Sequence, residues 1–351
     1  MRTLDAAANR AAEAIRTLED LARFALNDPL LSRSLKQHRH RLRKTLAQID
    51  RDQRLLVRDV AGDVGTRIST ATETQRADLN SIAAAAGSRS AEALRTVEEL
   101  MKTISAESAT QVESIRYAMY SLAAQIEQRL RPSDRRDRLM RSQIYVLVDV
   151  GPDDAGFAER VSSLIEAGVD VIQLRDKTVD DRTLLERATR LVELAGSSDT
   201  LTIVNDRADI TMAANADGVH VGQEELPVAA VRKLIGFERL LGLSTHNTEQ
   251  ATAPETSHVD YIGCGPIFPS STKAFDRVTG PEWLGEVASQ TGRPAFAIGG
   301  ITLENVDQIS ARGIRRVAVT ASLGRAVKDL PEIVGRFRQS LGELATLEAG
   351  G

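Results

Sequence analysis

Apolar residues recur at three- and four-residue spacing through the first third of the chain, as they do on one face of an α-helix. A stripe of this kind from Ala11 to Ala25 predicts a first helix. Asn27-Asp28-Pro29 interrupts it, and Pro29 is suited to the first turn of a second helix. A less regular section covers residues 59–69, after which the helical spacing continues to about residue 130. The pattern predicts an all-α domain over residues 1–130.

Two stretches of this helical region have similar sequences. Residues 9–20 read NRAAEAIRTLED and residues 88–99 read SRSAEALRTVEE. The repetition predicts a duplicated helical unit. Charged residues in each copy are three positions apart, so they lie on neighbouring faces of a helix. They fit either solvated ion pairs or an anion-binding groove, and the sequence leaves both interpretations open.

The pattern changes after residue 130. Residues 131–142 combine a proline with dense charge and few apolar residues, which predicts a linker. Beyond it, short β-runs alternate with helical patterns, and eight such units in about 200 residues predict a (β/α)8 TIM barrel over residues 143–345. The alternative is a doubly wound open sheet, but the first run lacks the glycine-rich fingerprint typical of that fold. The eight runs are Ile144–Val150, Val169–Leu174, Leu201–Val204, Gly218–Val221, Leu240–Leu243, Tyr261–Phe268, Ala295–Ile298 and Arg316–Thr320.

Charge and composition narrow the class of protein. Residues 1–142 hold 25 basic and 19 acidic side chains, and the remainder holds 20 and 30, so the two halves have opposite sign. Aromatic residues make up only 3% of the chain, which disfavours a nucleic-acid interface. The single Cys264 fits a reducing compartment. No apolar run approaches the roughly 20 residues of a membrane helix. We expect a cytoplasmic protein without nucleic-acid or membrane partners.

Polar and charged residues follow several of the predicted strands, where a barrel builds its active site. Arg175 and Lys177 follow the second strand and Lys273 follows the sixth. Three cations at one mouth suit a diphosphate. Asp206 ends the third strand and Glu225 follows the fourth, and two carboxylates facing a diphosphate favour a bound Mg²⁺. The alternative for each carboxylate alone is a structural salt bridge.

A second phosphate site is predicted at the last two strands. Gly299-Gly300 follows the seventh strand and Thr320-Ala321 follows the eighth, where barrels often cradle a phosphate with backbone N–H groups. The alternative for the two glycines is a tight turn. A metal–diphosphate site beside a monophosphate site implies two phosphorylated substrates, with transfer to a nucleophile and departure of diphosphate.

Residues 143–345 resemble the thiamine-phosphate synthase (thiamine-phosphate pyrophosphorylase) family. The resemblance implies a transferase that joins hydroxymethylpyrimidine diphosphate to hydroxyethylthiazole phosphate with Mg²⁺, giving thiamine phosphate and diphosphate. It also implies a dissociative path through a pyrimidine methylene cation. The motifs that carry it are Gln173-Leu174-Arg175-Asp176-Lys177, Asn205-Asp206, Gly218-Val219-His220-Val221-Gly222-Gln223, Ser244-Thr245-His246, Gly265-Pro266-Ile267-Phe268-Pro269 with Thr272-Lys273, and Ile298-Gly299-Gly300-Ile301.

Roles carry over from the family by position. The resemblance implies that Asp206 and Glu225 bind Mg²⁺, although the family usually has Asp where Glu225 stands. A serine is also common in the family where Ala321 stands. The residues implied for the pyrimidine diphosphate are Gln173, Leu174, Arg175, Asp176, Lys177, Asn205, Ser244 and Lys273, and those implied for the thiazole phosphate are Ser270, Ser271, Thr272, Gly300, Thr320 and Ala321.

Two other functions compete with the transferase. A thiazole tautomerase or regulator-like relative would share the fold without coupling two substrates, but it has no diphosphate for Asp206, Glu225 and Lys273 to bind. A binding or regulatory protein would use the barrel only to sense a ligand. The helical region resembles the N-terminal extension of longer family members, which implies a role in the pyrimidine branch, such as phosphomethylpyrimidine kinase, yet residues 62–66 lack a Walker lysine. The sequence does not decide whether the protein forms a homo-oligomer.

Overall fold

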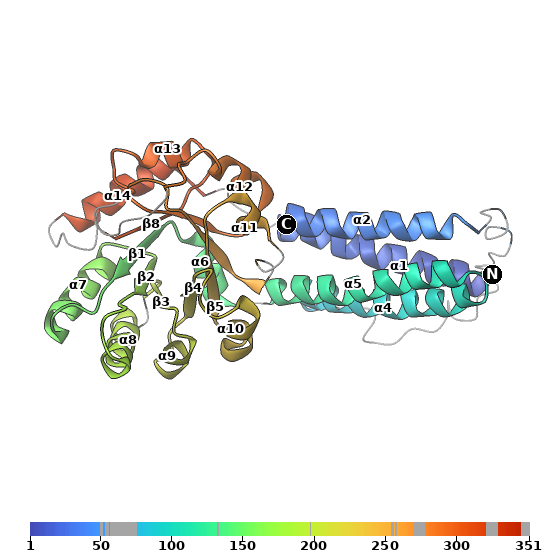
Figure 1. Ribbon diagram of the computed structural model, residues 1–351, viewed down its shortest axis with the longest axis horizontal. Helices are drawn as coiled ribbons and strands as arrows, with labels where there is room; N and C mark the ends of the chain where they lie inside the picture. The colour runs from blue at the N-terminus through green and yellow to red at the C-terminus, as the bar shows by residue number, and fades with distance from the viewer. Residues whose placement is uncertain are drawn as a thin grey trace. The chain divides into compact units, whose positions relative to one another are not determined.

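A computed structural model describes residues 1–49, 52, 56, 76–131, 133–196, 198–253, 256, 258–269, 278–320 and 329–344 of the chain. It contains two compact units, Met1–Pro132 and Ser133–Gly351 (Figure 1). Within the described ranges, every helix is too short or too polar to cross a membrane. The irregular section at residues 59–69, including residues 62–66, lies outside the described residues.

The regular elements among the described residues of the N-terminal unit are all helices, which confirms the helical spacing. Its helix α1 packs against both α2 and α4, and α4 packs against α5 along most of its length (Figure 1). Alanines and leucines fill the contact, including Ala7, Ala11, Leu35 and Leu94, which are fully buried. The elements are α1 (Arg2–Asp20), the π-helical turn η1 (Leu21–Ala25), α2 (Pro29–Leu46), α4 (Leu79–Lys102) and α5 (Ala106–Leu130).

The helix boundaries follow from local chemistry. Asp28 caps α2 by accepting hydrogen bonds from the backbone N–H groups of Leu30 and Leu31, both at 2.9 Å. Pro29 occupies the first turn, where its missing N–H costs nothing, as the sequence predicts. Asp78 begins α4 with a capping box, in which Asp78 and Ser81 each bond to the other's backbone.

The first copy of the repeated sequence buries an acidic side chain at the end of α1. Glu19 is bound by Arg39 of α2, whose Nε lies 2.8 Å from Glu19 Oε2, and also by Arg16 one turn earlier. Burial raises the pKa of Glu19, but the hydrogen bond and charge of Arg39, with the charges of Arg16 and Lys36, together outweigh it, so the net pKa is below its usual range. This pair is therefore a packed contact between helices rather than a solvated one.

The second copy repeats the arrangement between α4 and α5. Arg116 Nε lies 2.8 Å from Glu98 Oε2, and Arg95 also contacts Glu98 from the preceding turn. Burial again raises the pKa of Glu98, but the hydrogen bonds and charges of Arg116, Lys102 and Arg95 together outweigh it, so the net pKa is lowered. Equivalent ion pairs in the two helix pairs agree with a duplicated unit. Of the charged residues for which the sequence left an anion-binding groove open, Arg16 and Arg95 both pair with carboxylates of the same unit.

Eight parallel strands close into a barrel in the second unit, with β1 pairing to both β2 and β8. This confirms the (β/α)8 TIM barrel and excludes the open sheet. All eight predicted runs contain a strand, in the predicted order. The strands are β1 (Ile144–Val148), β2 (Val171–Leu174), β3 (Leu201–Asn205), β4 (Gly218–Val221), β5 (Leu240–Thr245), β6 (Tyr261–Cys264), β7 (Ala295–Ile298) and β8 (Val317–Val319).

Alternation along the strands separates two apolar layers. Side chains such as Ile172 and Leu174 pack outward with the helices, which surround the barrel in Figure 1. Side chains on the other face, including Tyr145, Tyr261 and Phe296, pack inside the barrel. The helices are α7 (Asp154–Glu166), α8 (Asp181–Ala195), α9 (Ala208–Ala213), α10 (Val228–Ile235), α11 (Thr248–Thr252), α12 (Leu284–Gln290), α13 (Val306–Ser310) and α14 (Leu330–Leu341).

The expected linker over residues 131–142 is largely a helix, and this corrects the sequence interpretation. Helix α6 (Asp134–Arg141) buries Leu139 in the interior apolar layer of the barrel. Its arginines bind carboxylates that stand just before strands: Arg135 lies 2.8 Å from Asp217, and Arg136 lies 2.8 Å from Asp260. The charge of this segment is therefore neutralised by the barrel rather than by solvent, and α6 belongs to the amino-terminal end of the barrel.

Candidate functional site

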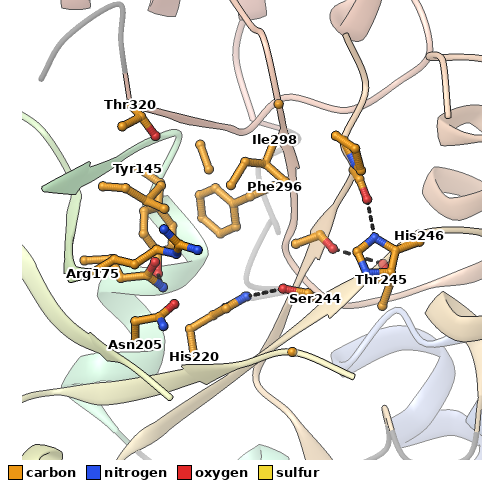
Figure 2. A pocket seen from close by; sticks show the side chains of 18 of the residues that line it. Tyr145, Arg175, Asn205, His220, Ser244, Thr245, His246, Phe296, Ile298 and Thr320 are labelled. Atoms are coloured by element: carbon orange, nitrogen blue, oxygen red, sulfur yellow. Dashed lines mark hydrogen bonds between the residues drawn. The ribbon is translucent and has the colours of Figure 1, made fainter. Parts of the chain in front are cut away.

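A cavity of about 1890 Å³ opens at the carboxyl ends of the barrel strands. Figure 2 shows Arg175, Asn205, Ser244 and Thr320 among the side chains that surround it. The structure thus brings together residues that are far apart in the sequence. The predicted site residues that line the cavity are Gln173, Arg175, Asp176, Lys177, Asn205, Asp206, Glu225, Ser244, Gly300 and Thr320. Ser270, Ser271, Thr272, Lys273 and Ala321 lie outside the described residues.

Leu174 does not line the cavity, unlike its neighbours in the same motif. It is fully buried in the outer apolar layer, because Gln173 points into the barrel and strand side chains alternate. The expected contact of Leu174 with the pyrimidine diphosphate is therefore not available to its side chain. Within this motif, Leu174 anchors the end of β2 against the helices.

Lys177 lies between the two carboxylates that the sequence assigns to a metal. Its Nζ is 2.8 Å from Asp206 Oδ2 and 3.2 Å from Glu225 Oε1. The hydrogen bond to Asp206 is the largest cause that raises the pKa of Lys177, with Glu225 adding to it. One cationic group therefore reaches both carboxylates at once. Lys177 is itself half exposed, so this cluster is open to the cavity.

The backbone holds both carboxylates in place by unusual local geometry. Asp206 has a φ of +60°, a conformation that few residues other than glycine adopt, and its N–H donates to the carbonyl of His220 at 2.8 Å. Gly222 gives Glu225 its room, since a Cβ at residue 222 would stand 2.4 Å from Glu225 Oε2. Strained backbone of this kind gathers at functional sites.

The carboxylate pair fits Mg²⁺. Asp206 and Glu225 lie close enough for one ammonium to contact both, and both face the cavity. Among the described residues, no cluster of three or more acidic, histidine or cysteine ligands exists. A pair suffices for Mg²⁺, which commonly uses one or two carboxylates together with substrate phosphates and water.

Asp176 shapes the loop after β2. One of its carboxylate oxygens accepts hydrogen bonds from the N–H and the hydroxyl of Thr178, at 2.8 and 2.6 Å. Burial raises the pKa of Asp176, but these hydrogen bonds and those from the backbone of Val150 and Val179 together outweigh it, so the net pKa is lowered. Arg175 joins the loop through its N–H, which donates to Val148 at 2.7 Å. The loop therefore holds Arg175 and Lys177 at the mouth of the cavity.

Gly299 and Gly300 are required by the close packing of two loops. Their φ values are +100° and +60°, and a Cβ at residue 300 would stand 2.1 Å from the carbonyl oxygen of Pro269. Phe268 donates its N–H to the carbonyl of Gly299 at 3.0 Å, which fastens the loop after β6 to the loop after β7. Gly300 and Thr320 both line the cavity, as a phosphate cradle requires.

Sequence reasoning missed two tyrosines inside the barrel. Tyr145 and Tyr261 line the floor of the cavity, and their hydroxyls are 3.0 Å apart. Gln173 Nε2 donates to Tyr145, and His220 contacts Tyr261 through Nδ1. His220 also contacts Ser244 through Nε2 (Figure 2). Burial lowers the pKa of His220 to about 4, so its imidazole is neutral. The available sequence signal was a tyrosine in each of two strands of a chain poor in aromatic residues.

Other residues orient the same wall of the cavity. Gln223 Nε2 donates to the carbonyl of Ser244 at 2.6 Å, and His246, labelled in Figure 2, contacts the carbonyl of Gly265 at 2.5 Å. Cys264 is fully buried in the outer layer, where burial raises the pKa of its thiol to about 12. The thiol is therefore a packing group and not a nucleophile.

The fold and cavity define a (β/α)8-barrel enzyme whose site combines cations, a carboxylate pair and a glycine-lined loop. Residues 144–323 match the family model described as thiamine monophosphate synthase, and residues 2–125 match the ThiD2 family. The chain is 50% identical to a thiamine-phosphate synthase of Rhodopirellula baltica over 92% of this chain and 88% of that protein. The chain belongs to the thiamine-phosphate synthase family.

Two further relatives agree with this placement. A thiamine-phosphate synthase of Nostoc punctiforme is 37% identical over 96% of this chain and 92% of its own length, so the resemblance includes the helical region. The solved structure of thiamine phosphate pyrophosphorylase from Pyrococcus furiosus matches with a TM-score of 0.51 and 30% identity. That match covers 59% of this chain and 96% of that one. These findings support the coupling transferase and not the tautomerase-like alternative.

Proposed function

We propose that this chain joins hydroxymethylpyrimidine diphosphate to hydroxyethylthiazole phosphate, releasing thiamine phosphate and diphosphate. The observation that carries the proposal is the approach of Lys177, Asp206 and Glu225 to one point of a cavity whose other wall holds Gly300 and Thr320. Lys177, Asp206 and Glu225 would bind a diphosphate together with its metal cation. Gly300 and Thr320, on the other wall, would bind a second substrate that carries one phosphate.

In this reaction the bond between the pyrimidine methylene and the diphosphate oxygen breaks first. The amino group of the pyrimidine shares its electron pair with the methylene cation, and the thiazole nitrogen then attacks the cation to form the new C–N bond. Arg175, Lys177 and Lys273 stabilise the charge that develops on the departing diphosphate. The protein contributes positioning and electrostatics, which fits a site without an activated nucleophile among its described residues.

We propose Asp206 and Glu225 as the residues that hold Mg²⁺. When bound, the metal neutralises the diphosphate and makes it a better leaving group. Lys177 then turns from the two carboxylates to the diphosphate, which its exposed position permits. Gly300, Thr320 and Ala321, with Ser270, Ser271 and Thr272, bind the thiazole phosphate. The substrates are small molecules, and the single cysteine fits our placement of the enzyme in the cytoplasm.

The first test is the complete reaction with the purified chain, both substrates and Mg²⁺, measuring thiamine phosphate and released diphosphate. Asp206→Ala is expected to lower kcat at least about a hundredfold and to remove the response to added Mg²⁺. Asp149→Ala is the matched control, because Asp149 also lines the cavity but pairs with Arg160 instead. Near-normal turnover and an unchanged Mg²⁺ titration in Asp206→Ala would remove this residue from the metal site.

The role of the helical region in the pyrimidine branch stays a prediction. Incubating the full chain with the pyrimidine monophosphate and ATP, without the thiazole phosphate, tests it directly. Formation of the pyrimidine diphosphate would support a kinase activity. The same rate from a fragment that begins at Ser133 would assign that activity to the barrel instead.

A further inference from the structure

A chain of hydrogen bonds runs through the barrel interior and joins two residues that we expect to contact the pyrimidine. Gln173 Nε2 donates to the Tyr145 hydroxyl at 2.9 Å, and this hydroxyl lies 3.0 Å from that of Tyr261. The Tyr261 hydroxyl is 3.2 Å from His220 Nδ1, and His220 Nε2 is 2.9 Å from Ser244 Oγ. Both ends of the chain, Gln173 and Ser244, line the cavity.

The chain has a direction that is set at its Gln173 end. An amide nitrogen can only donate, so the Tyr145 oxygen accepts there and its single proton is left for Tyr261. Tyr261 then donates to His220 Nδ1. A neutral imidazole has one donor and one acceptor, so Nε2 carries the proton and donates to Ser244 Oγ. Both tyrosines are buried, so each hydroxyl proton is best satisfied by its neighbour in the series of hydrogen bonds.

The direction determines what each end of the chain offers a ligand. Ser244 Oγ accepts from His220, which leaves the hydroxyl proton free to donate into the cavity. One N–H of the Gln173 amide donates to Tyr145, which fixes the orientation of the amide group and leaves its carbonyl oxygen to accept a hydrogen bond. One acceptor and one donor complement an aminopyrimidine edge, where an exocyclic amino group stands next to a ring nitrogen. Glutamine and asparagine bind the similar edge of adenine for the same reason.

We infer that Tyr145, Tyr261 and His220 are positioning residues that fix Gln173 as an acceptor and Ser244 as a donor, and thereby select an aminopyrimidine over an oxopyrimidine. An oxopyrimidine reverses the pattern of the edge, presenting a carbonyl oxygen beside a ring N–H. The inference rests on the proposed function, because it takes the pyrimidine diphosphate as the substrate.

Small residues on neighbouring strands make room for this chain. A Cβ at Gly242 would stand 2.2 Å from the Tyr261 ring carbon Cζ and 2.4 Å from His220 Nδ1. A Cβ at Gly263 would stand 3.3 Å from His220 Cε1. Neither glycine has a positive φ, so the space and not the backbone conformation accounts for them. The barrel interior is built to hold the His220–Tyr261 contact.

The first test reads the direction without any substrate. ¹⁵N NMR of the histidine-labelled full chain distinguishes the Nε2-protonated from the Nδ1-protonated tautomer of a neutral imidazole. The chain has only five histidines, so the signal lost in His220→Gln identifies the residue. We expect His220 to be protonated at Nε2. Protonation at Nδ1, or a mixture of the two tautomers, would overturn the inference.

The second test interrupts the series of hydrogen bonds at its middle residue. Tyr261→Phe removes one hydroxyl while keeping a ring to pack against Tyr145 and Phe296. We expect kcat/KM for the amino substrate, and the preference for it over the 4-oxo analogue, each to fall about tenfold, with the KM for the thiazole phosphate within about twofold. Tyr145→Phe should lower both quantities to the same extent. The double variant should lose no more kcat/KM or preference than either single variant. An unchanged amino-over-oxo preference in Tyr261→Phe would overturn the inference.

A matched control distinguishes the effect of breaking this series of hydrogen bonds from the effect of losing any buried hydroxyl. Thr200 is buried just before β3, and its hydroxyl donates to the carbonyl of Val169 at 2.8 Å. Thr200→Val should lower the melting temperature without changing the amino-over-oxo preference. If Thr200→Val loses as much of this preference as Tyr261→Phe does, the series of hydrogen bonds does not set the preference. Failure of the proposed function remains distinguishable, because a full chain that forms no thiamine phosphate still reports the His220 tautomer.

Discussion

The helical region and the mouth of the barrel both gather carboxylates around a basic side chain, but with opposite exposure. In the helical region, Glu98 is 1% exposed, and Arg116 from the next helix covers it at 2.8 Å. At the barrel mouth, Asp206 and Glu225 are 20% and 28% exposed, and the lysine between them is 53% exposed. The first arrangement is closed by the protein itself. The second is open on the side where a ligand enters.

This difference separates a structural role from a binding role. A buried carboxylate that loses its partner is left without solvent or counter-charge, so breaking such a pair is costly, about 3 to 5 kcal/mol. A bridge from an exposed lysine contributes little to stability, because water replaces it readily. The charge at the barrel mouth is therefore free to be used for binding. Perturbing each group should separate stability from activity.

The largest effect is expected at Lys177. Lys177→Gln should slow thiamine phosphate formation about a thousandfold, since a donor aimed at developing charge contributes up to about 4 kcal/mol. The melting temperature should change little, because the side chain is half exposed. Single-turnover rates and thermal melts of the same preparation measure both quantities.

Lys102 provides the matched control for Lys177. It is 50% exposed and also contacts two carboxylates, Glu98 at 3.3 Å and Glu99 at 2.9 Å, but it belongs to the helical region. Lys102→Gln should leave turnover unchanged. If Lys102→Gln slows the reaction as much as Lys177→Gln does, the effect of Lys177→Gln does not arise from binding of the diphosphate at the barrel mouth.

A smaller effect, on stability instead of turnover, is expected at Glu98. Glu98→Gln should lower the free energy of unfolding of the helical region by about 3 kcal/mol, because the buried Arg116 loses its close counter-charge and keeps only the exposed Glu113 at 4.0 Å. Urea titrations followed by circular dichroism measure this, and thiamine phosphate formation should be unaffected. A change below about 0.5 kcal/mol would show that the buried pair stabilises no more than a surface one.

The pH dependence of this difference has a definite sign. The pKa of Glu98 is lowered in the folded chain, so the stabilisation that its carboxylate supplies is present above the unfolded pKa. It is lost as the pH falls through the folded pKa. The stability gap between the unaltered chain and Glu98→Gln should therefore narrow on acidification and reach a plateau at neutral pH.

The sequence predicted the elements whose pattern is local. Strand alternation and strand-end chemistry located all eight strands and the cavity, since both follow from neighbouring residues. Features that depend on distant partners were missed. The charge of α6 resembles a linker until Asp217 and Asp260 are known to face it. The contact between Tyr145 and Tyr261 depends on which strands face each other across the closed barrel.

The buried ion pairs of the helical region show the same limit. Arg16 and Glu19, three residues apart, look like a surface pair, and Arg16 is indeed 46% exposed. Glu19 is buried because Arg39, 20 residues away on α2, packs over it. Spacing within one helix describes its faces but not which neighbouring helix covers them.

The smallest effect is expected when the helical region is removed at the correct boundary. A fragment beginning at Ser133 keeps helix α6 whole, and Ser133 caps it by accepting from the N–H of Arg136 at 3.5 Å. All described cavity residues lie within this fragment. It should fold and form thiamine phosphate within about twofold of the full-chain rate, with its own compact core. Activity assays and thermal melts of the two proteins measure this.

A fragment beginning at Gln143 is the sharper comparison, because it removes α6 and nothing of the predicted barrel. It loses the buried Leu139 and the guanidinium groups that neutralise Asp217. Leaving that partly buried carboxylate without its arginines and exposing an apolar patch should make this fragment markedly less stable than the one from Ser133. If the fragment from Ser133 is folded but inactive while the full chain is active, the helical region completes the site. If the two fragments are equally stable, residues 134–141 act as a linker and not as part of the barrel.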